Sequence, residues 1–138
     1  MPVKKEKAKY DIVMLIDDND IDNFINGQMI SGCNFAETTY VNTSTRSAIE
    51  FLRNLSVNKV LRKDHLPALI FLDINMPILD GFQFIEEFEK LDKEIVSSIK
   101  IIMLTSSINP SDIERSKKFS SVKGFIHKPL TEEALGQC

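Results

Sequence analysis

The sequence has few cysteines, few glycines and no long apolar run, and each shortage excludes a class of protein. The two cysteines, Cys33 and Cys138, are far apart, so they indicate neither a disulfide framework nor a thiolate metal cluster. We therefore expect a reduced, cytoplasmic setting. The apolar run at 12–16 is too short for a signal peptide, and the run at 66–72 is too short to span a membrane.

The glycine content and the charge exclude further classes. The five glycines form neither a glycine-rich phosphate loop nor a G-x-S-x-G elbow, which disfavours nucleotide hydrolysis and serine esterase chemistry. The net charge is only −3, from 17 Lys and Arg against 20 Asp and Glu, so electrostatics gives no reason to expect nucleic acid as a direct partner. With 138 residues, 43% of them hydrophobic, the chain is expected to form one globular domain.

Short apolar segments recur along the chain and have the length of β-strands. They lie at 12–16, 68–72, 101–104 and 124–126. Because their apolar residues are consecutive rather than alternating, they are typical of strands buried on both faces of a parallel sheet. The more polar segment 35–41 predicts one further strand, at an edge of the sheet.

Segments with apolar residues at helical spacing separate these strands. Their stripes are Ile21, Phe24, Ile25 and Met29; Ala48, Ile49, Leu52 and Leu55; Phe84, Ile85, Phe88 and Leu91; and, more weakly, Ile113 and Phe119. The alternation predicts an α/β fold, with a doubly wound five-stranded parallel sheet and helices on both faces. In such folds, functional groups gather at the carboxyl ends of the strands.

Four of the predicted strands end in polar residues that suit one site. Asp17 and Asp18 follow the first strand, Asp73 the third, Thr105 the fourth and Lys128 the fifth. Three carboxylates at one edge would raise one another's pKa unless a cation lay between them. Mg²⁺ suits such an oxygen-rich site. A carboxylate beside a metal, a lysine and a hydroxyl is arranged to act as a nucleophile toward a phosphoryl group.

Each of these features also has an ordinary structural explanation. An Asp pair can cap a helix, an Asp before a turn is common turn chemistry, a Thr that ends a strand reflects β-propensity, and Lys-Pro is common in loops. A functional site is favoured because all of them fall at the ends of predicted strands.

Four segments of the chain, in this order, resemble the receiver domain of two-component response regulators. They are MLIDDND, LIFLDINMPILDG, IIMLTSS and GFIHKPL, and the resemblance covers residues 11–135. It implies a flavodoxin-like sheet with the strand order 2-1-3-4-5. We accordingly divide the chain into a basic, flexible tail at 1–10 and a receiver domain at 11–138.

The resemblance assigns roles to the acidic edge of the predicted site. Asp73 corresponds to the phosphoacceptor, which also takes part in the metal site. Asp18 corresponds to a direct Mg²⁺ ligand and Asp17 to one that acts through water. Asn75 corresponds to the residue whose main-chain carbonyl completes the metal site.

The resemblance also implies the parts of a phosphate-binding switch. Thr105 corresponds to the switch hydroxyl, Lys128 to the phosphate-binding lysine, and Phe125 to the switch aromatic, where tyrosine is more frequent. Ser106 is small and should leave access to Asp73 open, while Asn75 and Ser107 lie where the family tunes dephosphorylation. The Lys128–Pro129 peptide bond is expected to be cis.

The implied function is that of a stand-alone response regulator. It would accept a phosphoryl group on Asp73 from a histidine kinase or a histidine phosphotransfer protein and signal to a downstream protein partner. We expect a monomer or weak homodimer that contacts neither nucleic acid nor membrane directly. It would not be an enzyme acting on separate substrates. The alternative is a small Mg²⁺-dependent phosphohydrolase of the haloacid-dehalogenase type, although its nucleophile follows the first strand in a D-x-D motif.

Two segments depart from a minimal receiver. After Thr131, only residues 132–138 remain for the last helix, so that helix is either short and held by the packing of Leu135, or cut off by the end of the chain. The segment 54–66 is longer than a minimal connection, and we interpret it as a solvated extension of the second helix.

Overall fold

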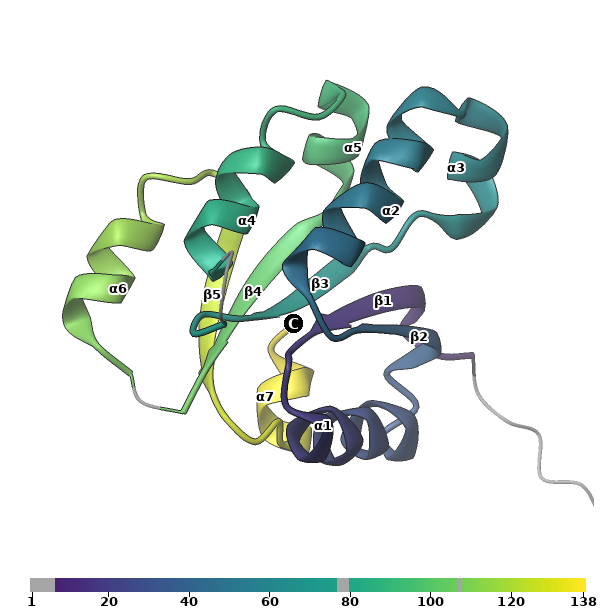
Figure 1. Cartoon of the computed structure of the whole chain (residues 1–138). Coiled ribbons are helices and arrows are strands. Elements are labelled where there is room, and N and C mark those ends of the chain that lie inside the picture. The colour runs from purple at the N-terminus through teal and green to yellow at the C-terminus, as the bar shows by residue number, and fades with distance from the viewer. Residues whose placement is uncertain (1–6, 77–79, 107) are drawn as a thin grey trace, which may run out of the picture.

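A computed structural model describes residues 7–76, 80–106 and 108–138, and it contains one five-stranded parallel sheet (Figure 1). The strand order is β2-β1-β3-β4-β5, as predicted. The strands are β1 (Tyr10–Ile16), β2 (Ala36–Asn42), β3 (Leu69–Asp73), β4 (Lys100–Thr105) and β5 (Val122–His127). Every neighbouring pair is parallel, so all the strand carboxyl ends lie at one edge of the sheet.

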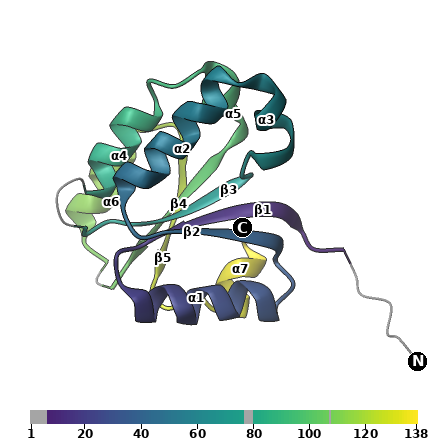
Figure 2. The ribbon, with the colours of Figure 1, turned by 45° about the vertical axis from the view of Figure 1, so that its right-hand side comes forward.

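Seven helices in the described residues cover the two faces of the sheet. They are α1 (Asp20–Gly32), α2 (Thr45–Val57), α3 (Lys59–His65), α4 (Gly81–Phe88), α5 (Lys93–Ser98), α6 (Pro110–Ser116) and α7 (Glu132–Gly136). Figures 1 and 2 show α1 and α7 on one face, with α2, α4 and α5 on the other. The buried side chains divide into two clusters that match these layers.

The three inner strands form the centre of both apolar layers. All five residues of β3 are buried, as are the last four of β1 and the last five of β4. This burial on both faces explains why their apolar residues are consecutive in the sequence. The more polar strand β2 lies at an edge, as predicted.

The helices α2 and α4 bury the apolar stripes that their sequences show. In α2, Ala48, Ile49, Leu52 and Leu55 are buried, and in α4, Phe84, Ile85 and Phe88 are buried. Both helices begin at a side chain that satisfies free backbone N–H groups: Ser44 caps α2, and Asp80 forms a capping box with Gln83 at α4.

Most of the predicted apolar stripe of α1 does not face the core, and of its four residues only Met29 packs against the core. Ile21, Phe24 and Ile25 are 70%, 67% and 43% exposed, respectively. The residues that α1 buries are Asn23, Asn26 and Ile30. The helical spacing therefore correctly predicted a helix, but it did not predict which face of the helix is buried. That face is largely polar.

The segment 54–66 is not a simple extension of α2. The chain breaks its helix at Asn58, whose side chain accepts hydrogen bonds from Val60 N and Leu61 N and so begins α3. In α3, Arg62 is buried and donates hydrogen bonds to carbonyl oxygens of Leu55 and Ser56. The interpretation as a solvated extension was therefore wrong for this part of the chain.

The two ends of the described chain lie close to the sheet. The strand β1 begins at Tyr10, the last residue of the predicted tail, and the hydroxyl of Tyr10 donates a hydrogen bond to the carbonyl of Cys138. The helix α7 has five residues, and its Leu135 is buried. Residues 1–6 of the predicted tail and Ser107 lie outside the described residues.

Within the described segments, no helix combines the length and the apolar character that crossing a membrane requires.

Candidate functional site

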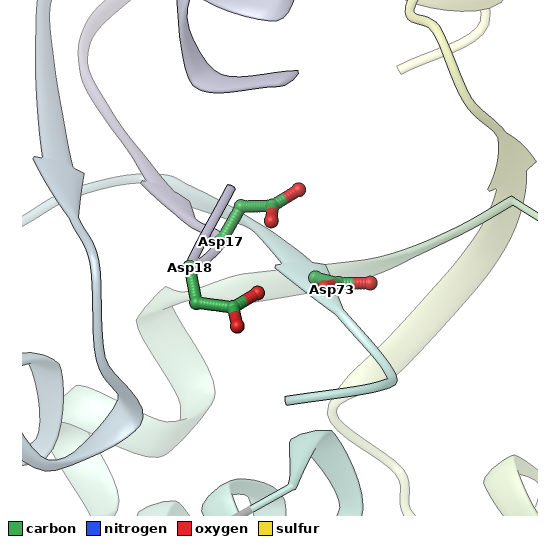
Figure 3. Close-up of side chains that lie close together, drawn as sticks. All are labelled: Asp17, Asp18 and Asp73. Carbon is green, nitrogen blue, oxygen red and sulfur yellow. The ribbon is translucent and has the colours of Figure 1, made fainter. Parts of the chain in front are cut away.

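Three carboxylates meet at the carboxyl edge of the sheet (Figure 3). Asp17 and Asp18 directly follow β1, and Asp73 is the last residue of β3, the neighbouring strand. One oxygen from each side chain lies within 4.8 Å of the others. Asp17 and Asp73 are buried, whereas Asp18 is exposed. The fold thus brings together the three acidic residues that the sequence placed at strand ends.

Backbone groups of neighbouring residues hold the two buried carboxylates in place. The N–H of Asn19 donates a hydrogen bond of 2.9 Å to Asp17 Oδ1, and the N–H of Asn75 donates one of 3.4 Å to Asp73 Oδ1. These N–H groups belong to the loops that leave β1 and β3. In each loop, a backbone N–H therefore orients the carboxylate of the residue two positions earlier in the chain.

Lys128 reaches the same place from the loop after β5. Its Nζ lies 2.6 Å from Asp17 Oδ2, 3.0 Å from Asp22 Oδ2 and 3.3 Å from Asp73 Oδ1. The backbone N–H of Lys128 donates a hydrogen bond of 2.8 Å to the carbonyl of Thr105, which fixes the start of this loop on β4. One ammonium group thus contacts three carboxylates, two of which are buried.

The charges of the site shift the pKa of Asp73 and of Lys128 upward. Burial and the nearby charge of Asp17 raise the pKa of Asp73 to about 6, and contact with Lys128 offsets only part of this effect. Burial alone would lower the pKa of Lys128, but hydrogen bonds to Asp17 and Asp22 outweigh it and raise that pKa. Negative charge is therefore in excess at this edge of the sheet.

The remaining predicted site residues lie on the neighbouring strands and loops. Thr105 is buried at the end of β4, and Ser106, which follows it, is exposed. Phe125 lies on β5, half-buried against the apolar cluster beneath α2 and α4. Asn75 is exposed, and the Lys128–Pro129 peptide bond is cis.

Gly81 is required because α4 approaches the end of β3 very closely. A Cβ atom at this position would lie 2.8 Å from the backbone oxygen of Asp73 and 3.0 Å from Cα of Ile74. The backbone N–H of Gly81 donates a hydrogen bond to the carbonyl of Ile74. The role of this glycine is therefore to permit the close packing of α4 against the end of β3.

Sequence reasoning missed three residues of α1 that contact the site. Asp22 forms an ion pair with Lys128, Asn23 Nδ2 donates a hydrogen bond to the carbonyl of Asp17, and Asn26 Oδ1 accepts one from Leu130 N. Asn23 and Asn26 lie on the buried side of α1, and Asp22, four positions before Asn26, is half-buried. The signal in the sequence was the spacing itself, because polar residues three and four positions apart share one helix face.

The donor set fits Mg²⁺. Carboxylate oxygens are its preferred protein ligands, and one or two carboxylates together with water are typical of its sites. Asp17, Asp18 and Asp73 supply oxygens only, and burial together with the charge of Asp17 raises the pKa of Asp73, so a divalent cation here would stabilise its charged form.

This geometry agrees with a comparison of the sequence with protein families. The model of the response regulator receiver domain matches residues 13–138. The chain belongs to this family. The membership confirms the resemblance and the fold class, and it disfavours a phosphohydrolase of the haloacid-dehalogenase type.

Individual relatives of this receiver domain share about a third or a quarter of its residues. A two-component response regulator from Cytophaga hutchinsonii has a similar crystal structure, with a TM-score of 0.83 and 32% identity over 96% of this chain and 94% of that chain. The polar-differentiation response regulator DivK of Brucella ovis is 27% identical over 86% of this chain and 85% of its own length.

Some curated relatives are much longer than this receiver domain. The sensor histidine kinase CheAY of Helicobacter pylori is 29% identical over 90% of this chain, but the chain spans only 14% of that kinase. The similarity therefore concerns one part of the longer protein and not its whole activity.

Proposed function

We propose that this receiver domain accepts a phosphoryl group on Asp73 from a phosphohistidine of a histidine kinase or phosphotransfer protein. The observation that carries the proposal is the convergence of Asp17, Asp18, Asp73 and Lys128 at one edge of the sheet. Membership in the receiver family supports it, because receiver domains interact with these proteins.

The chemistry follows from the groups around Asp73. A carboxylate oxygen of Asp73 forms the new bond to phosphorus while the bond from phosphorus to the histidine nitrogen breaks, and the imidazole leaves with the electron pair. Asp17 and Asp18, with Asp73 and the main-chain carbonyl of Asn75, would hold Mg²⁺, which when bound supplies positive charge for the phosphoryl oxygens. Lys128 would provide a further positive charge at the same oxygens.

The switch in this proposal uses Thr105 and Phe125. A phosphoryl group adds roughly two negative charges to Asp73. The hydroxyl of Thr105, at the end of the adjacent strand β4, would turn to donate a hydrogen bond to it. Phe125 is half-buried, and in this proposal it would turn inward as Thr105 moves. The resulting change of surface around α6 and β5 would be recognised by a protein partner.

We place the phosphodonor on the exposed apolar stripe of α1, formed by Ile21, Phe24 and Ile25. This stripe begins four residues after Asp17, and Asp22, the residue after Ile21, contacts Lys128. Three large apolar side chains exposed together on one helix face are typical of a protein-binding surface. A helical donor domain could pack along this stripe and bring its phosphohistidine to the edge of the sheet.

The proposal makes the chain a stoichiometric acceptor and not an enzyme for separate substrates. Incubation with acetyl phosphate and Mg²⁺ should add one phosphoryl group per chain in the wild type and in Asp64→Asn, an exposed control on α3, but none in Asp73→Asn. Intact mass spectrometry measures this, and chelation of Mg²⁺ should abolish it. Release of many equivalents of phosphate from small phosphoesters would instead favour an enzyme.

A further inference from the structure

Asp22 is a carboxylate of the site that has no place in the chemistry proposed above. It lies in the first turn of α1, and its side chain is 36% exposed. It does not belong to the group of carboxylates that could share a metal ion, which consists of Asp17, Asp18 and Asp73. Its Oδ2 lies 3.0 Å from Lys128 Nζ. Among the described residues, Lys128 is the only cation within 4.0 Å of this carboxylate.

Lys128 already donates hydrogen bonds to two carboxylates, Asp17 and Asp22, and its Nζ lies 3.3 Å from Asp73 in a third ion pair. An ammonium group carries three N–H bonds, and its partners here are Asp17, Asp22 and Asp73. A phosphoryl oxygen on Asp73 would be a new acceptor for Lys128, and it would compete with the carboxylates that Lys128 already contacts. Asp17 and Asp73 would share their charge with Mg²⁺ in the phosphorylated state, but Asp22 keeps its full charge.

We infer that Asp22 is a positioning residue that holds Lys128 in the unphosphorylated protein and competes with the phosphoryl group for it. Asp22 thereby lowers the stability of the phosphorylated state relative to the unphosphorylated one. Because Asp22 lies between Ile21 and Phe24 on α1, a protein that docks on the apolar stripe contacts the same helix turn that retains Lys128. The docking of a protein on the stripe and the release of Lys128 from its ion pair are therefore linked through Asp22.

This inference rests on the proposed function, and beryllofluoride tests the two separately. At saturating Mg²⁺, beryllofluoride is titrated into the protein and its binding is followed by amide NMR. The wild type should bind it. The variant Asp22→Asn should bind it about three- to tenfold more tightly, the range expected when a partly exposed ion pair no longer competes.

Asp20→Asn is the matched control, because Asp20 lies in the same first turn, is exposed and carries the same charge. It removes an equal charge from the helix terminus without removing an ion pair of Lys128. Its affinity for beryllofluoride should stay within about twofold of the wild type. Asp22→Glu, which restores the carboxylate, should return the affinity toward that of the wild type, and Asp22→Ser gives a second variant without the carboxylate.

The contact itself can be measured in the protein without ligand. The ¹³Cε and ¹⁵Nζ signals of Lys128 should shift in Asp22→Asn and Asp22→Ser but not in Asp20→Asn. Unchanged signals, or equal affinities in Asp22→Asn and Asp20→Asn, would overturn the role of Asp22 while leaving the proposed function intact. Failure of the wild type to bind beryllofluoride would instead contradict the proposed function.

Discussion

The carboxyl group of Asp73 lies in a poorly hydrated position beside a second buried carboxylate, Asp17. Burial raises its pKa to about 6, from an ordinary value of 3.8, and the charge of Asp17 adds to the effect. In the folded chain, the charged form of Asp73 is therefore less stable than in the unfolded chain. The folded state binds more protons between these two pKa values, so its stability falls as the pH rises through this range.

Replacing Asp73 should consequently stabilise the protein in the absence of Mg²⁺. We expect Asp73→Asn to raise the free energy of unfolding by about 1–2 kcal/mol at pH 7.5. This range lies below the full free-energy equivalent of the pKa shift. Below the ordinary pKa of 3.8, as at about pH 3.5, the carboxyl is protonated in both the folded and the unfolded chain, and the difference should shrink toward zero. Urea unfolding at both pH values in a chelating buffer measures it, and a less stable variant at pH 7.5 would contradict the charge conflict.

Gly81 gives a test of packing at the scale of one methyl group. In Gly81→Ala, the new Cβ would meet backbone atoms of Asp73 and Ile74, which cannot move aside as a flexible side chain can. We expect a loss of about 2–4 kcal/mol in the free energy of unfolding. The control is Gly27→Ala in the interior of α1, where a Cβ meets nothing within 4 Å, and it should be stabilising. Similar changes in both variants would argue against the close approach.

At the scale of the elements, α1 shows how an exposed apolar stripe can be mistaken for a core-facing one. Its apolar stripe has the spacing of a core-facing helix, yet the core takes Asn23 and Asn26 instead. These two amides hydrogen-bond to the backbone of Asp17 and Leu130, so they tie the helix to the loops of the site. No pattern of apolar residues could reveal this, because long-range hydrogen bonds to the loops decide which face turns inward.

If the stripe on α1 binds the protein phosphodonor, a substitution in it should slow phosphotransfer from that protein but not from a small-molecule phosphodonor. In Phe24→Ser, phosphotransfer from a cognate phosphotransfer protein should be slower by about tenfold, since a large apolar contact is lost. Labelling by acetyl phosphate should be unchanged, because Phe24 is not part of the site. Val57→Ser, at an exposed position on α2, is the control and should transfer normally. Equal rates for Phe24→Ser and the wild type would refute docking on this stripe.

Arg62 connects the elements at the other end of the molecule. Besides its bonds to carbonyls of α2, it forms ion pairs with Asp92 and Glu94, which lie at the start of α5. Arg62→Ala should lower the free energy of unfolding by about 2–4 kcal/mol, because two backbone carbonyls lose their donor. Arg53→Ala, which breaks an exposed pair with Glu87, should change it little. Both variants should still be labelled on Asp73.

At the scale of the whole molecule, the apolar pattern predicted the inner strands, because strands buried on both faces have consecutive apolar residues, whereas the strand order was implied by the resemblance to receiver domains. The ends of β1 and β3 then placed Asp17, Asp18 and Asp73 together without further information. The helix α5 was not predicted, and α3 was expected only as a solvated extension of the second helix. The helices α3 and α5 have seven and six residues, respectively, and α3 is held by Arg62, a charged residue that sequence patterns assign to the surface.

The central claim is that Asp73 is the residue that accepts the phosphoryl group. Borohydride reduces an aspartyl phosphate to homoserine, so reduction after treatment with acetyl phosphate and Mg²⁺ marks the acceptor, and peptide mass spectrometry locates it. The account predicts homoserine at position 73 alone, and its loss when Mg²⁺ is chelated. Homoserine at position 17 or 18, or at any other aspartate, would contradict it.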